Sequence, residues 1–147
     1  MEAIDIHHVP AISAKRRAEI SQYSFWDVKL WDFKDPKNRQ LIIDVLLHHP
    51  SSIVRHEVSF SIGKYGLSAL LPYLMMVILN DTRTVAQHEA VEALDGMDEK
   101  YYREICDFLR RLLTHEEYAR IIQHPDIRET ITIVLERMES EIANGFA

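Results

Sequence analysis

The chain carries the stretch IVRHEVSFSIGKY at residues 53–65 and, 32 residues further on, the related stretch VAQHEAVEALDGM at residues 85–97. This offset superimposes one His-Glu pair on the other and also aligns the apolar positions around them. An internal period of this length is typical of repeats in which pairs of helices stack side by side. The two stretches therefore predict a helical solenoid with a His-Glu pair at the same place in two successive repeats.

Apolar residues recur at helical spacing along most of the sequence, which contains only 4 glycines. We therefore expect an all-α fold, an α-solenoid of about three helical pairs, in which residues 1–147 form a single domain. We expect Ser52 and Thr84 to be the N-caps of the second helix in the first two pairs. The expected pairs are 38–48 with 53–65, 67–79 with 84–97, and 101–113 plus a short piece with 127–141.

The N-terminal part of the chain is expected to form a cap on this solenoid. Residues 1–12 are interpreted as a loose arm, and Ser13 can cap a first helix that runs toward Tyr23. An aromatic-rich segment follows at residues 25–33. These aromatic side chains either cover the open end of the solenoid, as terminal repeats require, or are buried in a partner.

Composition and charge argue against several classes of function. The net charge is −6 and the basic residues are scattered, so the sequence does not indicate a surface that binds nucleic acid. The single cysteine, Cys106, is read as a small buried apolar residue. The longest apolar stretch, residues 67–79, is too short to cross a membrane, and the N-terminus does not have the pattern of a secretory signal. We expect a cytoplasmic protein.

The two His-Glu pairs are the candidate functional residues. On a helical wheel His56 and His88 fall opposite the apolar stripe of their own helix, and Glu57 and Glu89 fall at its flank. Neighbouring helices pack about 8–10 Å apart, so these side chains can converge on one ion. Two imidazoles and one carboxylate suit non-haem Fe(II), although they also accept zinc or manganese. The alternative is a solvated concave face that carries histidines through duplication alone.

A third pair, His115-Glu116, lies outside the 32-residue frame. Thr114 and Glu117 around it match a capping box, which explains the pair without a metal. The second helix of the third repeat has Glu129 near the position where a histidine would be expected, so the motif is not predicted to continue there.

The segments Val54-Arg55-His56-Glu57-Val58 and 85–94 resemble the HEAT-like repeats of deoxyhypusine hydroxylase and, more loosely, the phycobilin-lyase-type repeats. In the hydroxylase family, four His-Glu pairs in two halves hold two irons that activate O₂ and hydroxylate a modified lysine. The resemblance implies that His56, His88 and Glu89 bind the metal and that Glu57 lies beside it and orients the substrate. Arg55 matches the family, whereas Gln87 departs from it.

The chain has two His-Glu pairs rather than four, so it resembles one half of the hydroxylase. A complete di-iron site would then require two copies with their concave faces together, as in a twofold homodimer. The leading hypothesis is a non-haem iron oxygenase or hydroxylase of this kind. The alternatives are a non-catalytic HEAT-like adaptor or lyase-type accessory protein that binds another protein on its concave face, and a zinc hydrolase. The residues leave open whether the chain is an enzyme and what its substrate is.

Overall fold

The computed structural model describes residues 4–145, and this range consists of helices and turns without a strand. The predicted all-α class is confirmed. The α-helices are α1 (Ala14–Ser21), α2 (Phe25–Lys29), α3 (Arg39–His48), α4 (Ser52–Lys64), α5 (Leu71–Asn80), α6 (Thr84–Leu94), α7 (Tyr102–Thr114), α8 (Ala119–Ile122) and α9 (Pro125–Ala143). Short 3-10 turns precede four of them, at Pro36–Asn38, Ser68–Leu70, Glu99–Tyr101 and Glu116–Tyr118.

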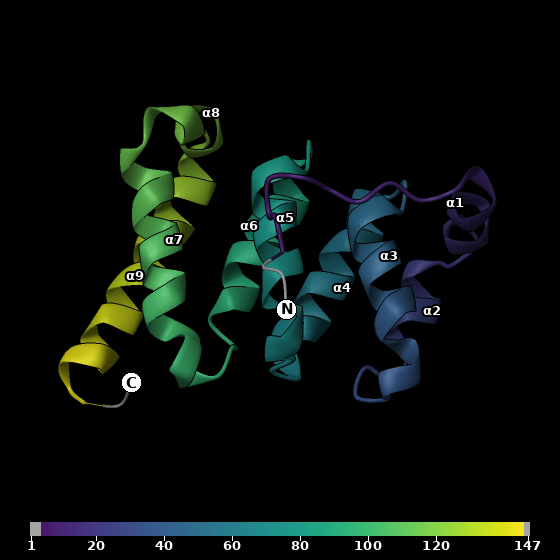
Figure 1. Ribbon diagram of the computed structural model, residues 1–147, viewed down its shortest axis with the longest axis horizontal. Helices are drawn as coiled ribbons and strands as arrows, with labels where there is room; N and C mark the ends of the chain where they lie inside the picture. The colour runs from purple at the N-terminus through teal and green to yellow at the C-terminus, as the bar shows by residue number, and fades with distance from the viewer. Residues whose placement is uncertain (1–3, 146–147) are drawn as a thin grey trace.

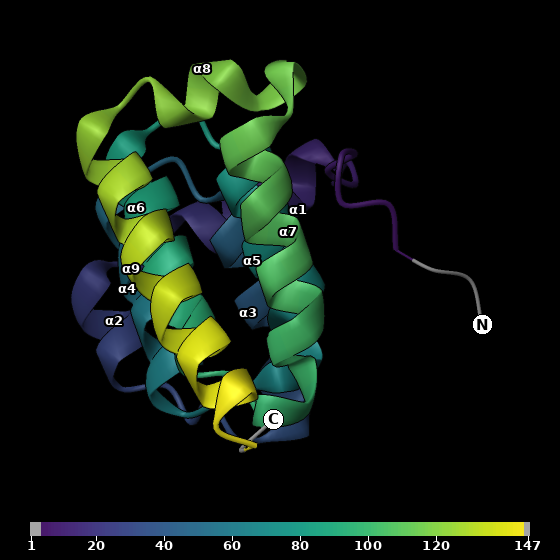
Figure 2. The same ribbon diagram turned by 90° about the vertical axis from the view of Figure 1, so that its left-hand side faces the viewer.

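The longer helices stand side by side in chain order, from α3 and α4 to α7 and α9 (Figure 1). They form two layers. Helices α3, α5 and α7 lie in one layer, and α4, α6 and α9 lie in the other, with α2 beside α4 (Figure 2). The core lies between the layers, where fully buried side chains such as Leu46, Leu74 and Leu109 meet Ile62, Leu94 and Ile131.

Helices α4 and α6 approach each other closely because a glycine lies at their contact. A Cβ atom built on Gly63 would be 2.8 Å from Ala93 Cα, and one built on Gly96 would be 2.1 Å from the Gly63 carbonyl oxygen. Because neither Gly63 nor Gly96 has a side chain, α4 and α6, which carry the His-Glu pairs, can lie this close together.

Polar contacts at the turns explain where the helices begin. The Ser13 hydroxyl accepts a hydrogen bond from the Arg16 N–H, as predicted. The predictions of Ser52 and Thr84 as N-caps are wrong by one residue. Ser51 caps α4, because its backbone is still extended after Pro50 and its hydroxyl accepts from Val54. Residue 83 is the cap of α6, and its N–H is already bonded to the Asp81 carboxylate.

The capping box predicted at Thr114 and Glu117 is also wrong. Thr114 is the last residue of α7, and its hydroxyl donates to the Arg110 carbonyl one turn earlier. A hydroxyl bonded back into its own helix cannot cap the following one. The turn after it begins at His115, which makes no capping hydrogen bond with its side chain.

The N-terminal segment crosses the outer ends of α3 and α5 before it reaches α1 (Figure 1). Of the arm predicted at 1–12, residues 1–3 lie outside the described range, and residues 4–12 contain no helix. Asn80 donates to the Ile6 carbonyl, and His7 Nε2 lies 2.7 Å from the Tyr118 hydroxyl. Ile6 and Ile12 pack against the core, so this segment connects the end of α5 with the turn before α8.

The aromatic residues of the N-terminal segment differ in their exposure. Phe33 is buried and stacks on Tyr65, and Trp31 packs edge-on against Tyr23. Trp26, by contrast, is 71% exposed. Part of the segment therefore covers the end of the helical stack, and part of it faces outward.

Within residues 4–145, every helix is too short or too polar to pass through a lipid bilayer.

Candidate metal site

The two His-Glu pairs lie on α4 and α6, which are adjacent helices of the same layer (Figure 2). The close approach at Gly63 brings the side chain of His56 on α4 to Glu89 on α6, with 3.2 Å between His56 Nε2 and Glu89 Oε2. Two residues that were predicted to act together are thus in direct contact, although they are far apart in the sequence.

The carboxylates and the imidazoles of the two pairs differ in burial. Glu57 and Glu89 are 6% and 7% exposed, whereas the His56 and His88 side chains are about one-third exposed, at 33% and 34%. A buried carboxylate without a cation is costly, because its charge has lost its hydration. The imidazoles therefore lie at the rim of the site, and the carboxylates form its floor.

Three side chains of α6 come together as a group that can hold a cation. His88, Glu89 and Glu92 each offer one ligand atom, and these atoms all lie within 4.8 Å of one another. His88 Nε2 is 3.5 Å from Glu92 Oε1. Glu92 was not predicted from the sequence. Its position four residues after His88 puts both side chains on one helix face, and this spacing was the signal that could have identified it.

Side chains of successive helices meet in a regular diagonal pattern across this layer. The Lys29 ammonium on α2 is 3.5 Å from the Glu57 carboxylate on α4. One helix further on, His56 meets Glu89 in the same way. On α9 the corresponding place is taken by Thr130, whose hydroxyl is 2.8 Å from His88 Nε2. We call these three contacts the diagonal pairs, and Lys29 and Thr130 terminate them at the two ends.

Glu57 does not belong to the group of ligand atoms on α6, because its charged partner is on another helix. Its carboxylate contacts Lys29 rather than a histidine. The four predicted residues divide accordingly: Glu89 contacts His56 and lies with His88 in the α6 group, and Glu57 lies nearby against a lysine.

The electrostatic state of Glu89 reflects its surroundings. Burial is the main reason why the pKa of Glu89 is raised to about 7. The negative charge of Glu92, a hydrogen bond with Glu92 and the negative charge of Glu57 raise this pKa further. Excess negative charge of this kind favours either a proton or a metal cation, and the two compete for the same carboxylate. The site thus has the charge and the nitrogen and oxygen donors that a divalent metal ion prefers.

Comparisons with known proteins point to one family. The chain is 29% identical over 90 residues to a deoxyhypusine hydroxylase of Aspergillus fumigatus, which covers 60% of this chain and 24% of that protein. It is 31% identical over 94 residues to the deoxyhypusine hydroxylase of Neurospora crassa, covering 63% of this chain and 26% of the relative. The Aspergillus clavatus protein of the same name is similar at 30% identity over 91 residues.

These similarities support a relation to the deoxyhypusine hydroxylases, as the sequence resemblance suggested. The matched stretch spans about a quarter of the length of these curated relatives. No protein-family model matches the chain, and no solved structure matches it.

Proposed function

We propose that this chain is a non-haem iron protein of the oxygenase or hydroxylase type. His56, His88 and Glu89 would hold the ion, and Glu92 would add a second carboxylate. The observation that carries the proposal is the buried Glu89 carboxylate, which contacts His56 and is grouped with His88 and Glu92. The relation to the deoxyhypusine hydroxylases supports the same assignment.

The donor set fits iron. Two imidazoles and a carboxylate form the ligand set of many Fe(II) oxygenases, which leave other coordination positions open. When bound, the iron would supply the activation of O₂. The same donors accept zinc and manganese, so they set the class of metal rather than its identity.

Glu57 would have a separate role beside the ion. It already holds the Lys29 ammonium at 3.5 Å, and its side chain is 8% exposed. A buried carboxylate that binds one ammonium group can orient a cationic or hydrogen-bonding substrate by exchanging partners. We therefore assign Glu57 to substrate positioning, with Lys29 as the competing cation when the substrate is absent.

The surrounding architecture would be a HEAT-like solenoid. The pairs α3–α4, α5–α6 and α7–α9 would be its three repeats, and α1 and α2 its N-terminal cap. An ion pair between consecutive pairs supports this, because Arg55 on α4 binds the Asp81 carboxylate after α5 at 2.8 and 3.0 Å. Nearest-neighbour contacts of this kind are what holds repeat proteins together.

We further propose that two copies assemble with their metal faces together, which would provide four His-Glu pairs in all. The layer formed by α2, α4, α6 and α9 exposes apolar side chains next to the diagonal pairs. Phe60 is 44% exposed and one turn from His56, and Ile133 is 58% exposed and three residues from Thr130. Exposed apolar area around a polar site is characteristic of an interface. The full set is Trp26, Leu30, Ile53, Phe60, Val85 and Ile133.

The same exposed side chains also favour a second candidate, a non-catalytic adaptor that binds another protein on this face. The two candidates differ in their metal content. An iron protein retains its metal through its histidines and absorbs visible light when oxidised, whereas an adaptor is colourless and binds its partner without iron.

The deciding experiment is elemental analysis of the untagged chain after anaerobic loading with Fe(II) and desalting. We expect about one iron per chain, and we expect H56A and H88A to lose it because each removes one nitrogen ligand. H115A is the matched control, because His115 lies in an exposed turn. Circular dichroism should show unchanged helix content in all three variants. Full iron retention in both H56A and H88A would overturn the assignment, and a chain that takes up no iron would favour the adaptor.

A further inference from the structure

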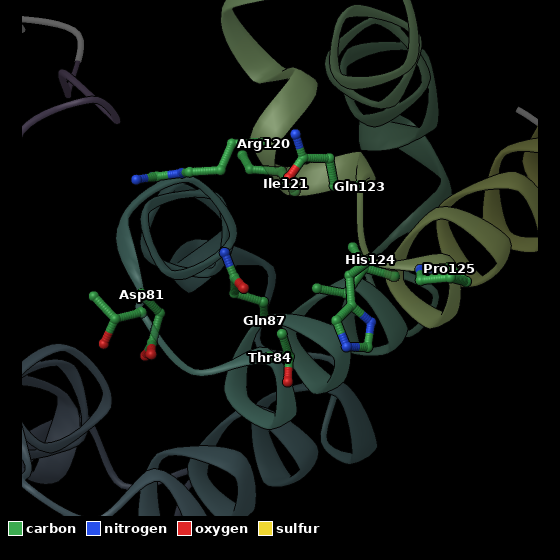
Figure 3. Close-up of a pocket in the computed structure, with 10 residues that line it drawn as sticks. Asp81, Thr84, Gln87, Arg120, Ile121, Gln123, His124 and Pro125 are labelled. Atoms are coloured by element: carbon green, nitrogen blue, oxygen red, sulfur yellow. The ribbon is translucent and has the colours of Figure 1, made fainter.

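A cavity of about 380 Å³ lies at one end of the helical layers. It is bounded by the turn before α6, by α8 and by the beginning of α9. Figure 3 shows Gln87 between Asp81 on one side and His124 on the other, with Arg120 and Gln123 above them. Ile121, Pro125 and Ile127 form its apolar wall.

The cavity lies at a position where the preceding helical pair has a longer side chain. In the preceding helical pair, the equivalent position is Arg55, whose guanidinium fills the space between the His49 carbonyl and the Asp81 carboxylate. Gln87 lies 32 residues later and reaches only the Ile78 carbonyl, to which its Nε2 donates at 3.0 Å. The space that a guanidinium fills in one pair is therefore open in the next.

Gln87 presents an unused acceptor to this space. Its side chain belongs to a residue that is only 7% exposed, and among residues 4–145 its Oε1 has no hydrogen-bond donor. Because the Nε2 is held by the Ile78 carbonyl while the Oε1 stays accessible, a ligand in the cavity can donate an N–H or O–H group to this oxygen.

Arg120 and the beginnings of two helices supply hydrogen-bond donors at the cavity. Arg120 forms no ion pair with any residue of the described range. Helices α6 and α9 both begin at the cavity, and neither has a side-chain cap on its first N–H groups. The N-termini of helices of 11 and 19 residues attract anions through these groups and the helix dipole.

The nearby carboxylate does not satisfy these donors. The Asp81 carboxylate accepts from Nε and Nη2 of Arg55 and from the Arg83 N–H, the last at 2.9 Å. Its negative charge is thus already balanced inside the protein. A guanidinium, two uncapped helix starts and the His124 imidazole remain for a ligand.

We propose that this cavity binds a small oxyanion that carries its own hydrogen-bond donor, such as a hydrogen phosphate or an α-hydroxycarboxylate. The oxyanion faces Arg120 and the beginnings of α6 and α9, and the hydroxyl group donates to Gln87 Oε1. Neither the diagonal pairs nor the apolar face takes part in this binding, so the site is separate from the proposed metal site.

The test is isothermal titration calorimetry of the full chain with inorganic phosphate, glycolate and acetate at constant ionic strength. We expect saturable binding of phosphate or glycolate with a Kd on the order of 1 mM. Acetate should bind more weakly, because it has no donor for Gln87. R120Q should weaken binding by about tenfold, the effect of losing one charge-assisted hydrogen bond. R128Q is the matched control, because Arg128 is exposed at the start of α9 and does not line the cavity.

Each result has a defined meaning. Selective loss of affinity in R120Q supports the site, and the preference between phosphate and glycolate identifies the source of the oxyanion. Equal affinity in R120Q and the unmodified chain would overturn the proposal, including the case in which the anion binds at a metal ion instead. Equal weakening in R120Q and R128Q would indicate general attraction to positive charge and would overturn it as well.

Discussion

At the scale of single residues, His49 is a buried imidazole that the fold keeps neutral. Its Nδ1 accepts the Ser51 N–H at 3.0 Å, and its Nε2 lies 2.8 Å from the Tyr23 carbonyl, to which it donates. Burial, reinforced by the positive charge of Arg55, lowers the pKa of His49 from its usual value of 6.5. A second proton would have to displace the Ser51 N–H, so protonation opposes the folded state.

This arrangement predicts how stability depends on pH. Below about pH 6.5 the unfolded chain binds a proton at His49 more readily than the folded chain does, so the free energy of unfolding falls as the pH falls. One such proton accounts for at most about 1.4 kcal/mol per pH unit. We expect H49Q to be less stable at every pH but to lose this part of the slope. Urea unfolding between about pH 5.5 and 7.5, with a chelator present, measures the difference.

Comparison of H49Q with the unmodified chain isolates His49, because the two proteins share every other titratable group, including Glu89. Burial also lowers the pKa of His48, and that contribution has the same sign in each protein. Identical pH slopes for H49Q and the unmodified chain would show that this imidazole does not titrate differently on folding.

The sequence could identify those members of the candidate site that the repeat duplicates. His56, His88 and Glu89 were predicted because a 32-residue period places them at equivalent positions of adjacent helices. Lys29 and Thr130 were not predicted, because they occur once each and reach the site only through the packing of α2 and α9. A period reveals what is repeated, whereas the residues that terminate the series depend on tertiary contacts.

At the scale of helices, Gly63 sets the distance between α4 and α6. In an ordinary exposed helix, replacing glycine by alanine stabilises by about 1 kcal/mol. Here we expect the opposite sign for G63A, because its Cβ would lie 2.8 Å from Ala93 Cα, which is backbone and cannot rotate away. Overpacking of this kind costs about 1–3 kcal/mol. Chemical denaturation measures the change in stability.

The same substitution tests whether helix spacing controls the metal site. Separation of α4 from α6 would draw His56 away from Glu89, so G63A should also bind iron more weakly than the unmodified chain. A stabilised G63A protein with unchanged iron affinity would mean that the two helices have room for a methyl group, contrary to the packing described above.

The positions of the helices were predictable, and their exact starts were less so. The apolar period placed both helices of the first two pairs within a few residues of α3, α4, α5 and α6. The caps were misplaced because serine or threonine occurs at neighbouring positions, as at Ser51 and Ser52, and the sequence does not say which residue is still extended. Before α6 that choice depends on a tertiary feature, because the Asp81 carboxylate accepts the Arg83 N–H and Asp81 is itself held by Arg55.

At the scale of the whole molecule, the apolar residues left exposed are concentrated on one face. Among the described residues, five of the eight exposed large apolar side chains lie on α2, α4, α6 and α9, around the diagonal pairs, and a sixth, Leu30, directly follows α2. The face made by α3, α5 and α7 is crossed instead by residues 4–12, and Ile6 packs there. The N-terminal segment thus packs on one side of the molecule, whereas the side formed by α2, α4, α6 and α9 keeps its apolar side chains exposed.

The homodimer proposal predicts what a charge on this uncovered face does. In a twofold assembly each substitution acts twice, and F60E would place one carboxylate from each copy in an apolar contact next to His56. Burial of a phenylalanine is worth about 1.5–3 kcal/mol, so its loss from both copies should raise the dimer dissociation constant by well over tenfold. We expect the unmodified chain to sediment at twice its mass of 17.2 kDa and F60E to sediment at 17.2 kDa.

I4E is the matched control for F60E, because Ile4 is 46% exposed but lies in the N-terminal segment, and the I4E protein should remain a dimer. A monomeric unmodified chain that still binds iron would assign the site to a single ion held by one chain, and dimeric F60E would place the interface elsewhere.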